Sequence, residues 1–274
     1  MRSGVVVDCS SAASEFIAGN TPHSPSTGAH SGGLHSERYG GAHRDPICEL
    51  SAAGDHGNAF IFTLNYDLLI ERMLIDDNVL GLRYQTTDFF SGLPERSEIL
   101  PLGAAGAGIA GRLFYPADPP IRSIHLHHLH GCLTHFRDTR TGDIYKISAA
   151  DTRDHDVFGR LAAAEASPFA PSVILGSRKI EKSQDWPFSH AFLSLEQAAR
   201  AATTIVIAGY SFRDLVVNKC LRNLTTPEKR WIIIDHRETD EAAQDFKDTV
   251  HNVIGDVEVE FVLTGFESPL PEVT

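Results

Sequence analysis

The chain has 274 residues, of which 42% are hydrophobic and 22% are charged. This composition can supply a buried core, and it excludes a disordered, collagen-like or coiled-coil chain. With 36 acidic and 24 basic residues the formal net charge is -12, which repels phosphate backbones and argues against general binding of nucleic acid. We therefore expect a globular protein without a nucleic-acid partner.

The cysteines are scattered along the chain and form no CxxC pair; they are Cys9, Cys48, Cys132 and Cys220. This spacing predicts neither a thiolate zinc site nor a disulfide framework, so we expect no bound metal and a reducing, cytoplasmic location. The sequence has no apolar run of membrane-spanning length, and residues 1–16 lack the apolar stretch of a signal peptide. No membrane partner is expected.

Residues 19–43 are rich in glycine, proline and serine, and Leu34 is their only branched aliphatic residue. Such a segment cannot offset the entropy of its ordering by burial, which is typical of a linker. We interpret residues 1–57 as a poorly ordered or degenerate N-terminal segment that contains this linker. Residues 58–274 are then expected to form the folded domain.

From residue 58 onward, short apolar runs alternate with helical patterns. Residues 59–64 read as a strand covered on both faces, and residues 68–74 as a helix. Further strands are predicted at 121–130, 171–176, 203–209, 230–235 and 257–263, and further helices at 188–199, 214–224 and 242–253. This succession predicts an α/β fold: a Rossmann-like, mostly parallel sheet with helices on both faces.

A glycine-rich string at residues 106–111 satisfies the GxGxxG spacing of a nucleotide-binding loop. Residues 98–102 before it make a poor strand, and Pro116 ends the following segment too soon for a dinucleotide helix. We favour a flexible surface loop here, with contact to a phosphate as the alternative.

Polar residues follow four of the predicted strands at the point where each strand ends. They are Asn65 and Asp67, then His130 and Gly131, then Gly209, Tyr210 and Ser211, and finally Asp235. The carboxyl ends of parallel strands meet at one edge of a sheet, where ligands bind near a topological switch point. One cleft could therefore be lined by all four groups.

These residue types suit the cleavage of a bond between a ribose and a cationic leaving group such as nicotinamide. Asn65 can donate and accept hydrogen bonds, Asp67 carries a negative charge, and His130 titrates near neutrality. Gly209 would let the backbone approach a phosphate. Asp235 could accept hydrogen bonds from ribose hydroxyls, or it could serve only as a helix cap or a solvated loop carboxylate.

Three other features have both a functional and a structural interpretation. Tyr210 and Phe212 could stack on adenine or pack in the core. Lys179 and its basic neighbours at 178 and 182 could neutralise phosphate or form a solvated turn. The four histidines between residues 125 and 130 put at most two imidazoles on each strand face, too few for a closed metal site.

Three segments in order resemble the sirtuin-like NAD hydrolase domains of bacterial defence proteins: TLNYD at 63–67, LHGCL at 129–133 and VIAGYSFRD at 206–214. The resemblance runs from about residue 60 to residue 235 and implies a Rossmann-like site that takes NAD as substrate and yields nicotinamide and ADP-ribose. Sirtuins that deacetylate proteins carry structural zinc on paired CxxC motifs. Because this chain has none, the resemblance favours NAD cleavage over lysine deacylation.

The resemblance also implies roles for individual residues. Asn65 would orient the ribose and the attacking water, His130 would act as general base or as partner of a ribose hydroxyl, and Asp67 would support the loop around nicotinamide. The residues expected to bind NAD are Thr63, Gly131, Gly209, Tyr210, Ser211 and Asp235.

The amino terminus departs from this family, which opens with a strand and a GAGxS-type phosphate loop. Here residues 4–7 are followed by DCSSAAS at 8–14, without a glycine. Either this segment is a degenerate version of the loop, or the chain is truncated and lacks the first β-α unit. The alternative function is thus a non-catalytic ADP-ribose or nucleotide-binding module, and a homo-oligomer or a defence partner protein fits either function.

Overall fold

The structure is a computed structural model, and it describes a defined part of the chain. The described residues are 4–8, 59–66, 68–71, 85–87, 89, 97–101, 107–113, 123–147, 152–153, 156–163, 168–176, 179–224 and 229–265. The predicted linker at 19–43 and the predicted catalytic residue Asp67 lie outside these residues.

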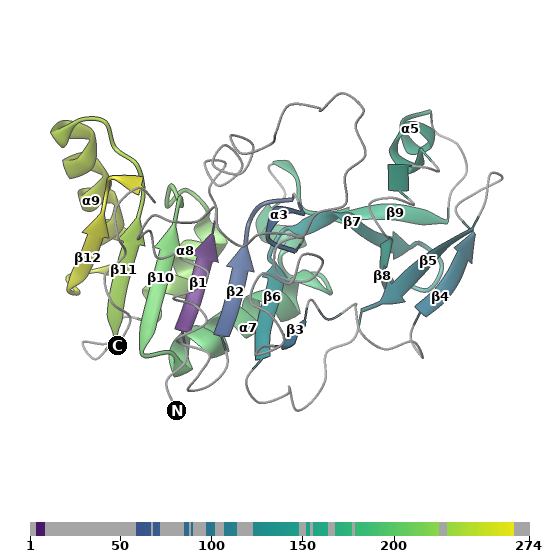
Figure 1. The fold of residues 1–274 in the computed structure, drawn as a ribbon, viewed down its shortest axis with the longest axis horizontal. Coiled ribbons are helices and arrows are strands. Elements are labelled where there is room, and N and C mark those ends of the chain that lie inside the picture. Colours follow the sequence, from purple (N-terminus) through teal and green to yellow (C-terminus); the bar gives the residue numbers. More distant parts are fainter. Residues whose placement is uncertain are drawn as a thin grey trace, which may run out of the picture.

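Seven strands form one parallel sheet in the order β12-β11-β10-β1-β2-β6-β3 (Figure 1). Their bounds are β1 (Gly4–Asp8), β2 (Ala59–Thr63), β3 (Gln85–Thr87), β6 (Ser123–His128), β10 (Thr204–Ala208), β11 (Arg230–Ile234) and β12 (Val259–Val262). The chain runs from β1 to β2 and β6 in one direction and through β10 to β12 in the other, so the topological switch point lies between β1 and β10. This order confirms the predicted Rossmann-like parallel sheet.

Strand β1 lies at the centre of this sheet, paired in parallel with both β10 and β2. The pairing is in register along the whole strand, with Val6 opposite Val206 on one side and Ile61 on the other. Residues 4–8, which we assigned to the segment before the domain, thus contribute a strand to the sheet formed by the later segments. The division of the chain at residue 58 stays a prediction.

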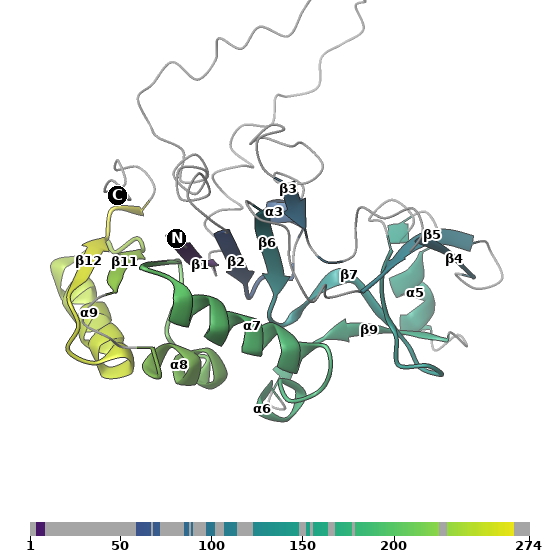
Figure 2. The same cartoon turned by 90° about the horizontal axis from the view of Figure 1, so that it is seen from below.

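Three long helices, α7 (Phe188–Ala201), α8 (Leu215–Arg222) and α9 (Asp240–Ile254), lie on the same side of the parallel sheet (Figure 2). Their buried faces and the strands enclose the main core, which includes Leu195, Ile205, Val217 and the fully buried Trp231. All three helices were predicted. The short helix α3 (Leu69–Glu71) is described. The residues that directly follow β1, and those that directly follow α3, lie outside the described part of the chain.

A second, antiparallel sheet lies beside the first, in the order β4-β5-β8-β7-β9 (Figure 1). Its strands are β4 (Ser97–Pro101), β5 (Ala107–Arg112), β7 (Gly131–Asp138), β8 (Ile144–Ile147) and β9 (Phe169–Val173). Short helices α5 (Val157–Ala162) and α6 (Lys179–Lys182) flank β9 in the sequence. Phe136, Tyr145 and Phe169 belong to a separate small core at this sheet.

This second sheet was not predicted, and it overturns two expectations. The glycine-rich string, expected as a surface loop, forms β5, whose backbone pairs with β4 and β8. It is not the strand-to-helix turn that a phosphate loop needs. The strand predicted at 171–176 ends sooner and pairs antiparallel with β7 instead of joining the parallel sheet.

Gly131 opens β7 in a conformation that only glycine tolerates well. Its φ is +82°, and a Cβ at this position would lie 2.0 Å from the carbonyl oxygen of Ser172 in the neighbouring strand β9. We expect Gly131→Ala to lower the free energy of unfolding by about 3 kcal/mol, because backbone strain adds to a clash with backbone. Urea denaturation measures the loss.

Gly176 is the matched control for this prediction. Its φ is +69°, but a Cβ there meets no atom within 4 Å. Gly176→Ala should therefore cost only about 1 kcal/mol, from the positive φ alone. Equal losses in the two variants would contradict the role of the close approach to Ser172.

Candidate functional site

The carboxyl ends of the parallel strands are level with one another. Thr63 at the end of β2 is opposite Asp8 and His128, and Ala208 at the end of β10 is opposite Asp8 and Ile234. The polar segments that follow β2, β6, β10 and β11 consequently leave the sheet at the same edge. The sequence prediction of one shared edge is confirmed for these strands.

His130 and Asp214 join two of the predicted segments. His130 lies in the turn after β6 and is 3% exposed, and its Nε2 lies 3.2 Å from Oδ2 of Asp214. Lys179, from α6, places its Nζ 3.6 Å from the same carboxylate oxygen. The basic turn predicted near residue 179 therefore neutralises a carboxylate of the protein itself.

Asp214 holds its position through α8. It is the N-cap of this helix, as the sequence allowed, and its Oδ1 accepts hydrogen bonds from the backbone N–H groups of Val216 and Val217. Burial would raise the pKa of Asp214, but hydrogen bonds from His130 and Val217 and the charges of His130 and Lys179 hold it at about 2. Asp214 is thus an anion at neutral pH.

The ionised carboxylate favours one tautomer of His130. Because a carboxylate cannot donate, a proton on Nε2, 3.2 Å from Oδ2 of Asp214, is the favoured arrangement. In the neutral ring Nδ1 is then the nitrogen that can take up a proton. This is the arrangement of a general base oriented by a carboxylate. Sequence reasoning found His130 but missed Asp214 as its partner.

The first of the three sequence segments, which begins at Thr63, contacts His130 through Tyr66. Its ring stacks on that of His130, with 6.4 Å between the ring centroids. Its hydroxyl donates to the carbonyl of Ile174, and burial followed by the charge of Asp214 raises the pKa of this phenol. Residues 63–66 and the segments 129–133 and 206–214 thus meet around His130.

Asn65 lies beside Tyr66 at the end of β2 and is partly buried. Its backbone N–H donates to Oγ1 of Thr63 at 3.1 Å, and its carbonyl oxygen lies 3.1 Å from Nδ1 of His128. Thr63 therefore contributes to the site by holding the backbone of Asn65. The contacts of Thr63 and Asn65 with NAD stay predictions.

The loop after β10 is held from inside by Tyr210. Its hydroxyl donates to Oδ1 of Asn218 at 2.8 Å and accepts from the N–H of Asp214 at 3.2 Å. Asn218 in turn donates to the carbonyl of Phe212, which has a positive φ of 55°. Tyr210 and Phe212 are 3% and 4% exposed, so their rings pack in the core, and contact of Tyr210 with NAD stays a prediction.

Gly209 and Ser211 occupy the outer part of this loop. Gly209 has a φ of +60° and donates its N–H to the carbonyl of Ile234, whereas Ser211 is exposed. Asp235, at the end of β11, accepts from the N–H of His236 and from Arg237, each at 2.7 Å. Burial raises its pKa. Its predicted contact with ribose would have to compete with Arg237.

The histidines of β6 pack on aromatic rings. His125 stacks on Phe60 and His127 on Phe62, each with 4.8 Å between ring centroids. Burial lowers the pKa of His125 to about 4, and burial, followed by the charge of His125, lowers the pKa of His127 as well. Both rings are therefore neutral core residues at neutral pH.

These buried rings predict a loss of stability in mild acid. Below about pH 6.5 the unfolded chain binds protons on these rings, whereas folded His125 binds one only near pH 4. Stability is present above this window and falls as the pH drops through it. For His125 alone the loss between about pH 7.5 and about pH 5 is about 2 kcal/mol.

Urea denaturation of wild type and His125→Phe at the two pH values checks this prediction. Phenylalanine keeps the stacked ring but cannot bind a proton, so the variant should lose about 2 kcal/mol less than wild type on acidification. An identical loss in both proteins would show that His125 does not cause the acid sensitivity.

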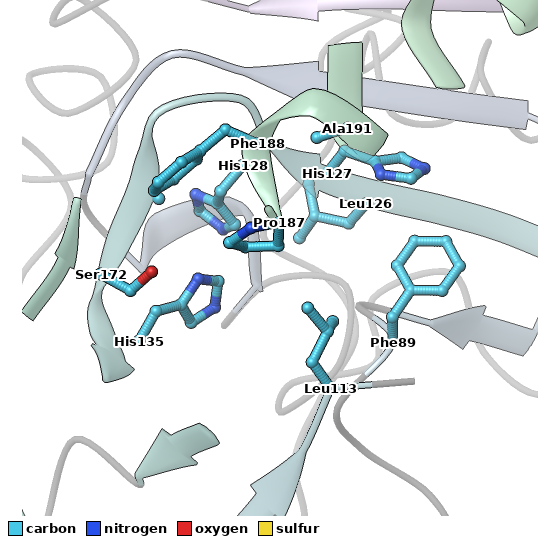
Figure 3. Close-up of a pocket in the computed structure, with 11 residues that line it drawn as sticks. Phe89, Leu113, Leu126, His127, His128, His135, Ser172, Pro187, Phe188 and Ala191 are labelled. Carbon is cyan, nitrogen blue, oxygen red and sulfur yellow. The ribbon is translucent and has the colours of Figure 1, made fainter. Parts of the chain in front are cut away.

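A small cavity lies between β6, the start of β7 and α7, and His128 and His135 point into it (Figure 3). Its volume is about 20 Å³, which suits about one water molecule and not a dinucleotide. Gly131, Ser172 and Phe188 also line it.

A buried charge cluster surrounds Glu71, which sequence reasoning placed in a helix without a role. Its Oε1 lies 2.9 Å from Nζ of Lys146 and 3.3 Å from Nε2 of His128. Burial would raise the pKa of Glu71, but the hydrogen bond and charge of His128 and the charges of Lys146 and His135 hold it at about 2. Glu71 is therefore ionised and paired.

Glu71, Cys132 and His135 also bring three possible metal-ligand atoms within 4.8 Å of one another. Burial and the charge of Glu71 raise the pKa of the Cys132 thiol to about 12, which disfavours the thiolate that binds metal. Lys146 and His128 pair with Glu71, so this carboxylate has counter-charges within the protein.

The parallel order, the switch point and the polar residues at the strand ends define a Rossmann-type ligand-binding edge. A family model described as SIR2-like domain matches residues 59–254, more than half of the chain. The protein therefore belongs to the SIR2-like domain family. No curated protein matches the sequence.

One similar solved structure is described as "Structural Basis for the Mechanism and Regulation of Sir2 Enzymes". It shares 12% sequence identity with this chain at a TM-score of 0.43, over 97% of this chain and 87% of that one. Among the described residues, no helix is long and apolar enough to cross a membrane.

Proposed function

We propose that this protein binds NAD at the carboxyl edge of its parallel sheet and hydrolyses it to nicotinamide and ADP-ribose. Membership of the SIR2-like domain family supports the choice of ligand. The observation that carries the proposal is the 3.2 Å contact between His130 and Asp214, with Tyr66 stacked on the same imidazole. It joins all three segments that the sequence had singled out.

The proposed reaction breaks the bond between the anomeric carbon of the ribose and the ring nitrogen of nicotinamide. A water oxygen bonds to the anomeric carbon, and the bonding electrons leave with neutral nicotinamide. Nδ1 of His130 takes the proton that the water gives up, and the Asp214 carboxylate stabilises the resulting imidazolium. His130 is thus a catalytic residue, and Asp214 positions it.

The other predicted residues have supporting roles in this proposal. Asn65 orients the ribose and the water, and Asp67 supports the loop around nicotinamide. Gly209 and Ser211, at the end of β10, face the phosphates or the adenosine ribose. The proposed NAD site is completed by residues at other strand ends and by one in the loop after β10. The former are Thr63, Gly131 and Asp235, and the latter is Tyr210.

We further propose that this activity serves bacterial defence in the cytoplasm, with a second copy of the chain or a defence partner protein. A second candidate function is a non-catalytic ADP-ribose or nucleotide-binding module. The observation that favours it is the absence of glycine at residues 8–14, directly after the central strand β1. A backbone without glycine there approaches a pyrophosphate less closely.

Incubation of the purified full chain with NAD, with chromatography of released nicotinamide, tests the two functions. We expect turnover by wild type and a loss of about 10²-fold in Asn65→Ala, because a misplaced water or ribose costs on this order. The control is Asn252→Ala, which replaces an exposed residue of α9. Thermal stabilisation by ADP-ribose without turnover would favour the binding module, and the absence of both would contradict both functions.

A further inference from the structure

We propose that Glu71 and His128 act as a buried positioning pair that fixes the backbone of Asn65, and thereby its side chain, for NAD cleavage. This inference rests on the function proposed above. Neither residue was among the sequence-predicted site residues. The two side chains are 5% and 2% exposed, so they act through Asn65 and not on the substrate.

The geometry places His128 between a carbonyl and a carboxylate. His128 ends β6, directly opposite Thr63 at the end of β2. Its Nδ1 lies 3.1 Å from the carbonyl oxygen of Asn65, and its Nε2 lies 3.3 Å from Oε1 of Glu71. One imidazole thus spans the distance from α3 to the loop that carries Asn65.

The Asn65 carbonyl oxygen has no proton, so Nδ1 of His128 is the donor in that hydrogen bond. On its other side the ring faces the Glu71 carboxylate across the 3.3 Å contact. Lys146, 2.9 Å from the same carboxylate oxygen, keeps Glu71 ionised and fixes its position.

The backbone around Asn65 is held from both sides. Its N–H donates to Thr63, and its carbonyl accepts from His128. The carbonyl of Tyr66 accepts from the N–H of Leu133 at 3.0 Å. Since both flanking peptide groups are fixed, the direction in which the Asn65 side chain leaves the backbone is fixed too. Loss of the His128 contact would leave a partly buried carbonyl without this donor and loosen the loop.

Two pairs of variants separate positioning from packing. In His128→Asn the side-chain nitrogen takes the place of Nδ1 and can still donate to Asn65, whereas His128→Phe keeps the ring volume but has no donor. In Glu71→Gln the amide can donate to Nε2 of a neutral His128, which still donates to Asn65 from Nδ1. Glu71→Ala removes this support.

We expect His128→Phe and Glu71→Ala to lower kcat for nicotinamide release by about 30-fold, with KM for NAD changed less than about threefold. His128→Asn and Glu71→Gln should recover to within about fivefold of wild type. A packing role predicts the reverse order at residue 128, because asparagine leaves a void that phenylalanine fills.

Hydrogen exchange of the backbone amides of residues 64–66 provides a readout that does not depend on activity. Exchange should be faster in His128→Phe and Glu71→Ala and close to wild type in the two conservative variants. If wild type shows no NAD turnover but this exchange pattern holds, the proposed reaction fails and the positioning pair stands. Unchanged exchange in all four variants, or His128→Phe more active than His128→Asn, would overturn the positioning pair.

Discussion

His130→Ala is expected to lower the rate of NAD cleavage by about 10³-fold, the order of magnitude that a general base contributes. The imidazole is buried, its Nε2 is committed to Asp214, and Tyr66 stacks on its face. The ring has one defined orientation and presents Nδ1 for the proton. Alanine removes this group but leaves the backbone turn between β6 and β7 intact.

Nicotinamide release under saturating NAD measures this loss, with His251→Ala as the control. His251 lies on α9, where it contacts Phe261 of β12, away from the meeting point of the three segments. The control should keep wild-type turnover. Equal activity of His130→Ala and wild type would remove His130 from the mechanism.

Asp214→Asn is expected to be as damaging as the loss of His130, although it changes few atoms. Asparagine can still cap α8, because its oxygen can accept from Val216 and Val217. Its NH2 group then faces Nε2 of His130 and donates to it, so the ring proton moves to Nδ1. A histidine in this tautomer cannot take a proton there, and a change of this kind costs about 10⁴-fold elsewhere.

Three variants separate orientation of the base from folding. Asp214→Asn should lose about 10³-fold or more in kcat with little change in thermal stability. Asp214→Ala should lose the cap as well and about 1 kcal/mol of stability. Asp248→Asn, on the exposed face of α9, should match wild type. Wild-type turnover in Asp214→Asn would show that the carboxylate does not orient His130.

The parallel sheet was predictable because its signals are local. β2, β10 and β11 are continuous apolar runs, and α7 repeats apolar residues at helical spacing. The antiparallel sheet escaped prediction because β5 contains two glycines in six residues and gains one of its two partners from a distant strand, β8, where Ile147 is opposite Ala110. Nothing within β5 distinguishes it from a loop.

The candidate site was predictable as a set of strand ends but not as a set of contacts. Asp214 was recognisable as a helix cap, yet its second oxygen contacts His130, which lies far away in the sequence. Glu71 lies in a predicted helix, and acidic residues are rarely buried completely. Its burial depends on Lys146 and His128 from two other strands, and only the folded chain brings these together.

The central claim is that Asn65 and His130, from separate segments, act in one NAD-cleaving site. Nicotinamide release by wild type, Asn65→Ala, His130→Ala and the double variant tests it as a mutant cycle. If both residues serve one reaction step, the double variant should be no more than about threefold slower than the slower single variant. Fold losses that multiply, or a wild type that releases no nicotinamide, would contradict the claim.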